Sequence, residues 1–309
     1  MLKDGAYDVL KGAMVPKPKY DFAVAYRIYP KVSKVPPVFS DDKLKLSELC
    51  LKSFIQSYQP LRPKFFAILD NCPEEYVSLF AENIPAEDLE FIRLAKLGNA
   101  GTFGLQMKIL SEQPHSDYIY FAEDDYFYLP GAFPHMLKFA ASGDDVHFVT
   151  PYDHHDYYSL ELHNSPHEVR FCSDRHWQTV GSTCMTFLTK KAVLAKAFEG
   201  LNTYTKGNTD VGLWFSLTKF RLGDFLDENS KTKETLPYVL GGWQHCFAQI
   251  MLGQKFKLWS PMPTIGTHMD HRFLSPGVDW GSLMREAAET ISTAKNAVNH
   301  EDHQPAAVR

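Results

Sequence analysis

The feature that most constrains this chain is the alternation of short apolar runs with amphipathic segments over its first half. The apolar runs are rich in β-branched and aromatic residues and predict strands at residues 22–26, 65–69, 89–93 and 118–122. The segments between them predict helices at about 44–55, 74–83 and 98–112. Such alternation is typical of right-handed crossovers and of a mainly parallel sheet. We therefore expect an α/β fold with a Rossmann-like, mainly parallel central sheet flanked by helices.

Polar residues follow three of these expected strands where each strand leaves the sheet. Asp70 ends the second strand, Gly101 follows the third, and Glu123, Asp124 and Asp125 directly follow the fourth. Ligands of parallel sheets bind at the carboxyl ends of the strands, so these residues should converge. Three adjacent carboxylates repel one another, and a hard divalent cation with oxygen ligands relieves that repulsion, particularly beside phosphates. A solvated acidic turn is the alternative interpretation.

Composition excludes several classes of protein. The chain has 309 residues, of which 44% are hydrophobic, enough for one large core or two unequal ones. Its net charge of -5 argues against a nucleic-acid partner, since duplex binding relies on clustered Lys and Arg. The five cysteines include no CxxC pair, which favours reduced thiols. No apolar stretch reaches the ~18 residues of a membrane span, and no signal peptide is recognisable. We expect a cytoplasmic protein without a transmembrane segment, and peripheral membrane contact stays open.

An ordered series of motifs gives the chain a resemblance to a known family. In order, the motifs are Ile68-Leu69-Asp70-Asn71, Asn99-Ala100-Gly101, Asp117-Tyr118-Ile119, Glu123-Asp124-Asp125 and Leu129-Pro130-Gly131-Ala132-Phe133. This series resembles the nucleotide-sugar half of the family-2 glycosyltransferases, which have the GT-A fold. The resemblance covers about residues 20–270 and is strongest from 64 to 133.

The resemblance implies a metal-dependent enzyme that moves a sugar from a nucleoside diphosphate sugar to a carbohydrate or other hydroxyl acceptor. It assigns Asp70 to the nucleotide base and Asp125 to Mn²⁺ or Mg²⁺ on the diphosphate, with Asp124 or Glu123 nearer the ribose and the metal-bound waters. The other donor-binding candidates are Tyr26, Asn99 and Gly101. The acidic motif is Glu-Asp-Asp instead of Asp-X-Asp, so the division of roles among the three acids stays open.

Two later residues complete the expected site. Asp210, before the apolar stripe of residues 211–217, resembles the family's later acidic motif, whose Asp takes the acceptor proton in inverting members. Alternatively, Thr209 or Asp210 simply caps a helix. His268 resembles the C-terminal His that several GT-A enzymes supply to the metal, with His271 in reserve. A structural role for a single His is the competing interpretation.

The middle of the chain is expected to contact the acceptor. Histidines are frequent there, at positions 154, 155, 163, 167 and 176, but their irregular spacing favours solvent-facing or acceptor-contacting side chains over a metal cluster. Residues 146–152 and 180–187 predict two further strands. The acceptor candidates are Trp177, Ser182, Trp243 and His271. The aromatic residues of this region fit sugar stacking and core packing equally well.

The expected organisation is an N-terminal arm (1–19), a GT-A domain (20–280) and a C-terminal helix with a frayed tail (281–309). Within the domain, residues 20–135 form the nucleotide-sugar half and 136–280 the acceptor half. Family breadth suggests glycan or surface polysaccharide biosynthesis. The alternatives are a sugar-nucleotide pyrophosphorylase, against which the lack of a Gly-rich, Lys/Arg-bearing phosphate loop argues, and a non-catalytic carbohydrate-binding protein.

Overall fold

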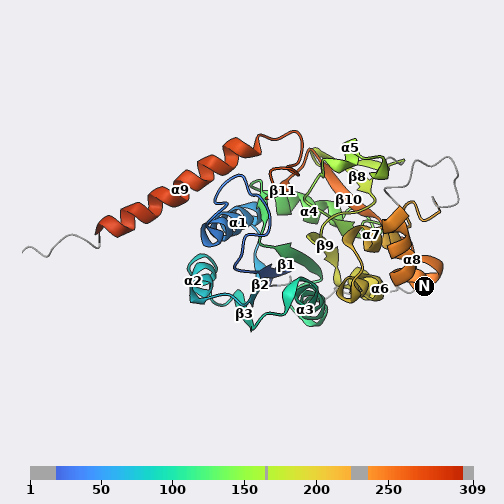
Figure 1. Ribbon diagram of the computed structural model, residues 1–309, viewed down its shortest axis with the longest axis horizontal. Coiled ribbons are helices and arrows are strands. Elements are labelled where there is room, and N and C mark those ends of the chain that lie inside the picture. The colour runs from blue at the N-terminus through green and yellow to red at the C-terminus, as the bar shows by residue number, and fades with distance from the viewer. Residues whose placement is uncertain (1–18, 164–165, 224–235, 302–309) are drawn as a thin grey trace, which may run out of the picture.

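A nine-stranded sheet organises the protein, with helices on both of its faces (Figure 1). The computed structural model describes residues 19–163, 166–223 and 236–301. Nearly all of the predicted N-terminal arm and the end of the predicted tail lie outside the described residues.

The sheet has the strand order β3-β2-β1-β4-β9-β6-β10-β8-β7. Its strands, in chain order, are β1 (Phe22–Ile28), β2 (Pro63–Asp70), β3 (Leu89–Leu94), β4 (Tyr118–Glu123), β6 (Phe148–Val149), β7 (Val169–Cys172), β8 (Arg175–Val180), β9 (Phe187–Lys190) and β10 (Leu258–Met262). The pairings make β9 and β8 antiparallel to their neighbours, so the other seven of the nine strands share one direction. The predicted mainly parallel α/β sheet is confirmed.

Two apolar cores cover the two faces of this sheet. The larger helices, in chain order, are α1 (Lys43–Tyr58), α2 (Glu74–Asn83), α3 (Gly98–Glu112), α4 (Ala132–Ala140), α6 (Lys191–Asn202), α7 (Asp210–Thr218), α8 (Leu236–Leu252) and α9 (Trp280–Glu301). Alternate residues of β1 face opposite cores, as the pleat requires. Phe22, Val24 and Tyr26 pack with α1, α2 and α4, whereas Ala23 and Ala25 pack with α3, α6 and α7.

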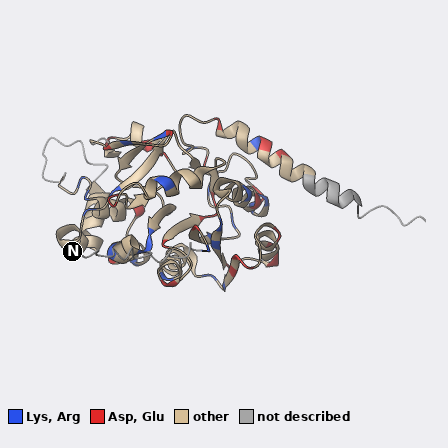
Figure 2. Cartoon of the chain, turned by 180° about the vertical axis from the view of Figure 1, so that it is seen from behind, with Lys and Arg blue, Asp and Glu red and all other residues tan. Residues whose placement is uncertain are grey.

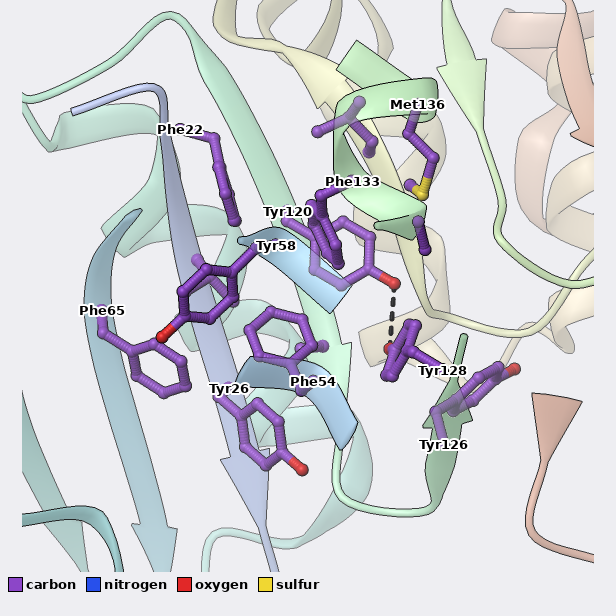
Figure 3. Close-up of a cluster of buried hydrophobic side chains, with 14 of the residues drawn as sticks. Phe22, Tyr26, Phe54, Tyr58, Phe65, Tyr120, Tyr126, Tyr128, Phe133 and Met136 are labelled. Atoms are coloured by element: carbon purple, nitrogen blue, oxygen red, sulfur yellow. Dashed lines mark hydrogen bonds between the residues drawn. The ribbon is translucent and has the colours of Figure 1, made fainter. Parts of the chain in front are cut away.

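Aromatic rings fill the core under α1 and α4 (Figure 3). Phe54 lies at the centre of this cluster, with ring centroids 5.0 Å from Phe133 and 5.6 Å from Tyr26. Two tyrosine hydroxyls in the cluster, those of Tyr120 and Tyr128, hydrogen-bond to each other at 3.0 Å. Tyr128 belongs to β5 (Tyr126–Tyr128), a short strand that the sequence did not predict. Close packing in this cluster holds β1, β2 and β4 in fixed positions, and with them the carboxyl ends of these strands.

Two expected strands of the second half are shorter than predicted. The run 180–187 is not one strand, because β8 ends at Val180 and β9 begins at Phe187. Between these two strands, the backbone hydrogen-bonds to a side chain instead of to a neighbouring strand: the Tyr157 hydroxyl donates to the Ser182 carbonyl at 2.6 Å. The run 146–152 is a strand only over β6. The sequence over-predicted both because apolar character alone does not show where ladder partners end.

The last described helix is α9, which begins at Trp280, one residue before the predicted C-terminal segment (281–309), and extends away from the body (Figure 1). Trp280, Met284 and Ile291 bury their side chains in a core shared with Leu46 and Leu49 of α1. Acidic and basic residues are interspersed along the elements (Figure 2). Among the described residues, no helix combines the length and apolar character that crossing a bilayer requires.

Candidate functional site

A cavity of about 430 Å³ lies at the carboxyl ends of β1, β2 and β4. The predicted site residues that line it are Asp70, Asn99, Glu123, Asp124, Asp125, Asp210 and His268. Residues that are up to 198 positions apart, from 70 to 268, thus share one cavity. The expected convergence at the strand ends is therefore what the structure shows, as in other parallel sheets.

Asp70 organises the loop before α3. It is 2% exposed, and its carboxylate accepts the backbone N–H groups of Lys96 (3.0 Å), Leu97 (2.6 Å) and Gly98 (2.7 Å). Gly98 has φ +78°, a conformation that glycine adopts without strain. These three bonds use both carboxylate oxygens and hold the segment that leads into α3, whose second residue is Asn99.

An ion pair crosses from β1 to β4 on the cavity floor. The parallel register places Arg27 beside Glu123, and the guanidinium donates to Glu123 Oε1 at 2.5 Å. Arg27 also donates to the carbonyl of Asn99 at 2.8 Å, while Thr186 donates its hydroxyl to Glu123 Oε2 at 2.9 Å. Glu123 is therefore held by a cation and a hydroxyl, and Arg27 joins both strands to the first turn of α3.

Asp124 is held by a lysine of α1. Lys43 Nζ lies 2.8 Å from Asp124 Oδ2, and the Tyr29 backbone N–H donates to the same carboxylate at 3.1 Å. Burial raises the pKa of the Asp124 carboxyl, although the neighbouring Lys43 opposes that shift. These contacts anchor Asp124, which lines the cavity, to α1 and to the loop after β1.

The buried pair leads to a stability prediction. The side chains of Lys43 and Asp124 are only 9% and 14% exposed, so Lys43→Met leaves a carboxylate without its cation. We expect the free energy of unfolding to fall by about 3 kcal/mol. Urea unfolding at neutral pH measures it, with Lys45→Met as the control because Lys45 pairs with Asp42 at the exposed surface. An equal decrease in the free energy of unfolding in both variants would show that the buried pair stabilises the fold no more than the exposed pair does.

Asp125 and His268 meet through a two-stranded ladder. β11 (Gly266–His268) runs antiparallel to β5 and pairs His268 with Tyr126, which brings the imidazole beside the last acid of the motif. His268 Nε2 lies 3.2 Å from Asp125 Oδ2. Burial opposes both charges, yet their mutual attraction holds the pKa of Asp125 below its usual range and raises that of His268.

These two side chains fit a divalent metal. Asp125 Oδ1 is buried and has no hydrogen-bond partner among the described residues, and a cation would supply one. Carboxylate oxygen and imidazole nitrogen are both suitable ligands for Mn²⁺. Within the described ranges, no group of three or more His, Cys, Asp or Glu side chains is arranged around a metal position. The remaining ligands would be water and the diphosphate, as is usual for Mg²⁺ beside phosphates.

The role of His268 can be tested separately from that of Asp125. We expect His268→Ala to weaken Mn²⁺-dependent binding of UDP or GDP by roughly 10- to 100-fold, because one ligand is lost while Asp125 and the diphosphate remain. His271→Ala is the matched control, since that imidazole is exposed, lies outside the first cavity, and has its Nδ1 3.2 Å from the Val35 carbonyl. Calorimetric titration with and without a chelator measures both. Unchanged Mn²⁺ dependence in His268→Ala would assign His268 a structural role.

Asp210 lies between this cavity and a second one. The second cavity, of about 250 Å³, shares Cys184 and Asp210 with the first. Thr209 is the N-cap of α7, because its hydroxyl accepts the Gly212 N–H at 3.0 Å. Asp210 Oδ1 accepts the N–H of its neighbour Val211 at 2.8 Å. The capping alternative therefore falls to Thr209. Burial raises the pKa of Asp210, and the negative charge of Glu123 raises it further. The hydrogen bond from the Val211 N–H lowers it but does not cancel the rise.

Several predicted residues lie away from the two cavities. Tyr26 is 1% exposed in the aromatic core, and Trp177 is equally buried, with its ring stacked on Phe139 at 4.3 Å. Neither side chain lines either cavity, because alternation along its strand points it at the core. Trp243 donates to the Leu222 carbonyl at 3.0 Å and does not line either cavity.

Of the three remaining predicted site residues, two lie outside the cavities and one lines the second cavity. Gly101 is inside the first turns of α3 and packs near the Leu97 side chain, outside the cavity lining. His271 is exposed and also lies outside both linings. Ser182 is the acceptor candidate that the structure places in the second cavity.

Sequence reasoning missed the cations of the site. Arg27 and Lys34 both line the first cavity, and Lys43 lies behind it on Asp124. The run from Arg27 to Pro37 is rich in lysine, which was a visible signal, but its basic residues had no predicted partner. His154 and His163 line the second cavity, where irregular spacing had hidden any shared role.

Comparison with known proteins gives structural similarity only. No known protein-family description matches the sequence, and no curated protein does either. Among solved structures, the galactosyltransferase LgtC with donor and acceptor sugar analogues is 9% identical at a TM-score of 0.44, covering 87% of this chain and 95% of that one. Glucosyl-3-phosphoglycerate synthase from Mycobacterium tuberculosis, with Mn²⁺, UDP and phosphoglyceric acid, is 10% identical at 0.39, covering 76% and 80%. TarS from S. aureus is 12% identical at 0.36, covering 74% and 72%.

Proposed function

We propose that this protein is a glycosyltransferase with a GT-A-like fold, which transfers a sugar from a nucleoside diphosphate sugar to a hydroxyl acceptor with inversion. The observation that carries the proposal is the position of Asp210, which shares one cavity with Asp125 and His268 and a second cavity with acceptor-type side chains. A donor and an acceptor can therefore meet at one carboxylate. Glycan or polysaccharide biosynthesis in the cytoplasm suits five free cysteines.

The first cavity suits the donor. The loop that Asp70 holds places Asn99 at its edge, and Lys34 supplies a cation from the loop after β1. Asp125 and His268 would hold Mn²⁺ or Mg²⁺, which when bound neutralises charge on the leaving diphosphate. Arg27 and Lys43 neutralise the other two acids, so Glu123 and Asp124 add little repulsion against the phosphates.

Asp210 serves as the general base. Its carboxylate takes the proton from the acceptor hydroxyl while the acceptor oxygen forms a bond to the anomeric carbon. The bond from that carbon to the diphosphate oxygen breaks, and its electron pair leaves with the diphosphate. Attack from the side opposite the leaving group inverts the configuration. A base acts most effectively when its pKa is near the working pH, and burial moves Asp210 in that direction.

The raised pKa predicts how activity depends on pH. Asp210 is an active base only when ionised, so kcat/KM should fall as pH drops through its pKa, at higher pH than for an ordinary Asp. Glu123 and Lys34 are the charged side chains that shift this pKa in opposite directions. A profile of kcat/KM from acidic to neutral pH measures the limb. Finding the same acidic limb in Asp210→Asn would assign it to another group.

Sugar-nucleotide turnover tests the proposal as a whole. The protein is incubated with a panel of UDP-, GDP-, CMP- and dTDP-sugars, with Mn²⁺, with Mg²⁺ and with a chelator. We expect Mn²⁺-stimulated release of nucleotide from one donor class. Consumption of a nucleoside triphosphate with sugar phosphate would indicate a pyrophosphorylase, and sugar binding without turnover of any donor would indicate a non-catalytic binding protein.

A further inference from the structure

The second cavity has a wall that is built from the histidine-rich segment after β6. This segment runs from His154 through α5 (Asp156–Ser159) to the short 3-10 helix η1 (Glu161–His163), and it contributes His154, Asp156 and His163 to the lining. Tyr157 anchors it to the opposite wall, because its hydroxyl donates to the Ser182 carbonyl at 2.6 Å. The wall is therefore fixed in place before any acceptor binds.

The polar groups of this wall suit hydroxyl groups. His154 Nδ1 accepts the Asp156 N–H at 3.0 Å, so the opposite ring nitrogen carries the proton of the neutral imidazole and can donate. His163 is 5% exposed, and its Nδ1 has no hydrogen-bond partner in the described part of the chain. A buried polar atom without a partner is costly, and a bound hydroxyl or water relieves that cost.

Among the described residues that line the cavity, the ionised side chains are all acidic. Asp156 and Asp210 bring two carboxylates to the lining. Burial lowers the pKa of His163 to about 4, so this imidazole stays neutral at physiological pH and does not offset them. Carboxylates accept hydrogen bonds from sugar hydroxyls and repel phosphate or carboxylate groups. Leu160 and Tyr238 add apolar surface on which the C–H face of a sugar ring can pack.

We propose that the second cavity takes an uncharged, polyhydroxylated acceptor, and that Asp156 is the residue that discriminates against anionic acceptors. This inference rests on the proposed function, since Asp210 must be the base at the junction for the cavity to hold the acceptor. It names a substrate class within that function: neutral sugars and their glycosides, rather than uronic acids or sugar phosphates.

The test compares matched acceptors at one donor. Octyl glycosides of neutral hexoses and of the corresponding uronic acids are offered with the sugar nucleotide that the protein hydrolyses. We expect kcat/KM for the neutral acceptors to be at least about tenfold higher, because like charges face each other in the uronic acid complex. Asp156→Asn should narrow that ratio about tenfold. Asp144→Asn is the control, because Asp144 is an exposed carboxylate that does not line the cavity, and it should leave the ratio unchanged.

The outcomes separate this inference from the proposed function. A kcat/KM for the uronic acids equal to or higher than that for the neutral glycosides would overturn the inference. So would an unchanged ratio of neutral to uronic acid kcat/KM in Asp156→Asn, provided that this variant has the wild-type melting temperature. Donor hydrolysis without transfer to any neutral glycoside, together with no saturation transfer from protein to these glycosides by NMR, would overturn it as well. In each of these cases donor hydrolysis persists and the transferase proposal stands, whereas loss of all donor turnover would refute that proposal itself.

Discussion

Asp125→Ala is expected to abolish glycosyl transfer, by about 10³-fold or more, together with Mn²⁺-dependent nucleotide binding. Asp125 brings the only carboxylate of the acidic motif that is not already paired with Arg27 or Lys43. A metal at a leaving diphosphate stabilises the transition state by several kcal/mol, which corresponds to this factor. Titration of UDP and GDP by calorimetry, with Mn²⁺ and with a chelator, measures the binding part.

The fold should survive this substitution. Asp125 Oδ1 has no hydrogen-bond partner among the described residues, so removing the carboxylate deletes an unsatisfied buried group as well as the contact with His268. Circular dichroism and the melting temperature check that the variant is folded. If the folded variant binds either nucleotide with wild-type Mn²⁺ dependence, Asp125 is not a metal ligand.

Asp210→Asn is the second large effect. We expect turnover to fall by ~10²–10⁴-fold with donor affinity nearly unchanged, because the amide cannot accept the acceptor proton. The free energy of unfolding should change by less than about 1 kcal/mol, since Thr209 caps α7. Donor affinity by calorimetry, turnover with a true acceptor and urea unfolding measure the three quantities.

The neighbouring residue provides the opposite control. Thr209→Ala removes the cap and should lower the free energy of unfolding by about 1 kcal/mol while turnover at moderate temperature stays near the wild-type value. If both variants were less stable than the wild type and neither lost turnover, Asp210 would have a role only at the helix terminus.

Sequence patterns predicted the strand ends of the first half and the acids that lie there. The alternation of strand and helix fixes which ends meet, so Asp70 and the motif from Glu123 to Asp125 could be placed without coordinates. Asp210 and His268 came from resemblance. No local sequence pattern predicts the pairing of β5 with β11, because each of these strands has only three residues.

The residues around the second cavity were predicted less well, for a physical reason. Trp177 was expected at a sugar, but the pleat of β8 points it at Phe139 in the core. His154 and His163 come together only because a short helix folds the segment back over the Ser182 loop. Pairing among charges is equally invisible in sequence: Lys43 and Asp124 are 81 residues apart and meet through tertiary packing.

The configuration of the transferred sugar tests the central claim most directly. The protein, its donor, Mn²⁺ and an accepted neutral glycoside are followed by proton NMR from the first turnovers, and the anomeric coupling constant of the product is read. A base at Asp210 between the two cavities predicts a product of inverted configuration that forms at wild-type rate and is nearly absent with Asp210→Asn. A product that keeps the donor's configuration would contradict it.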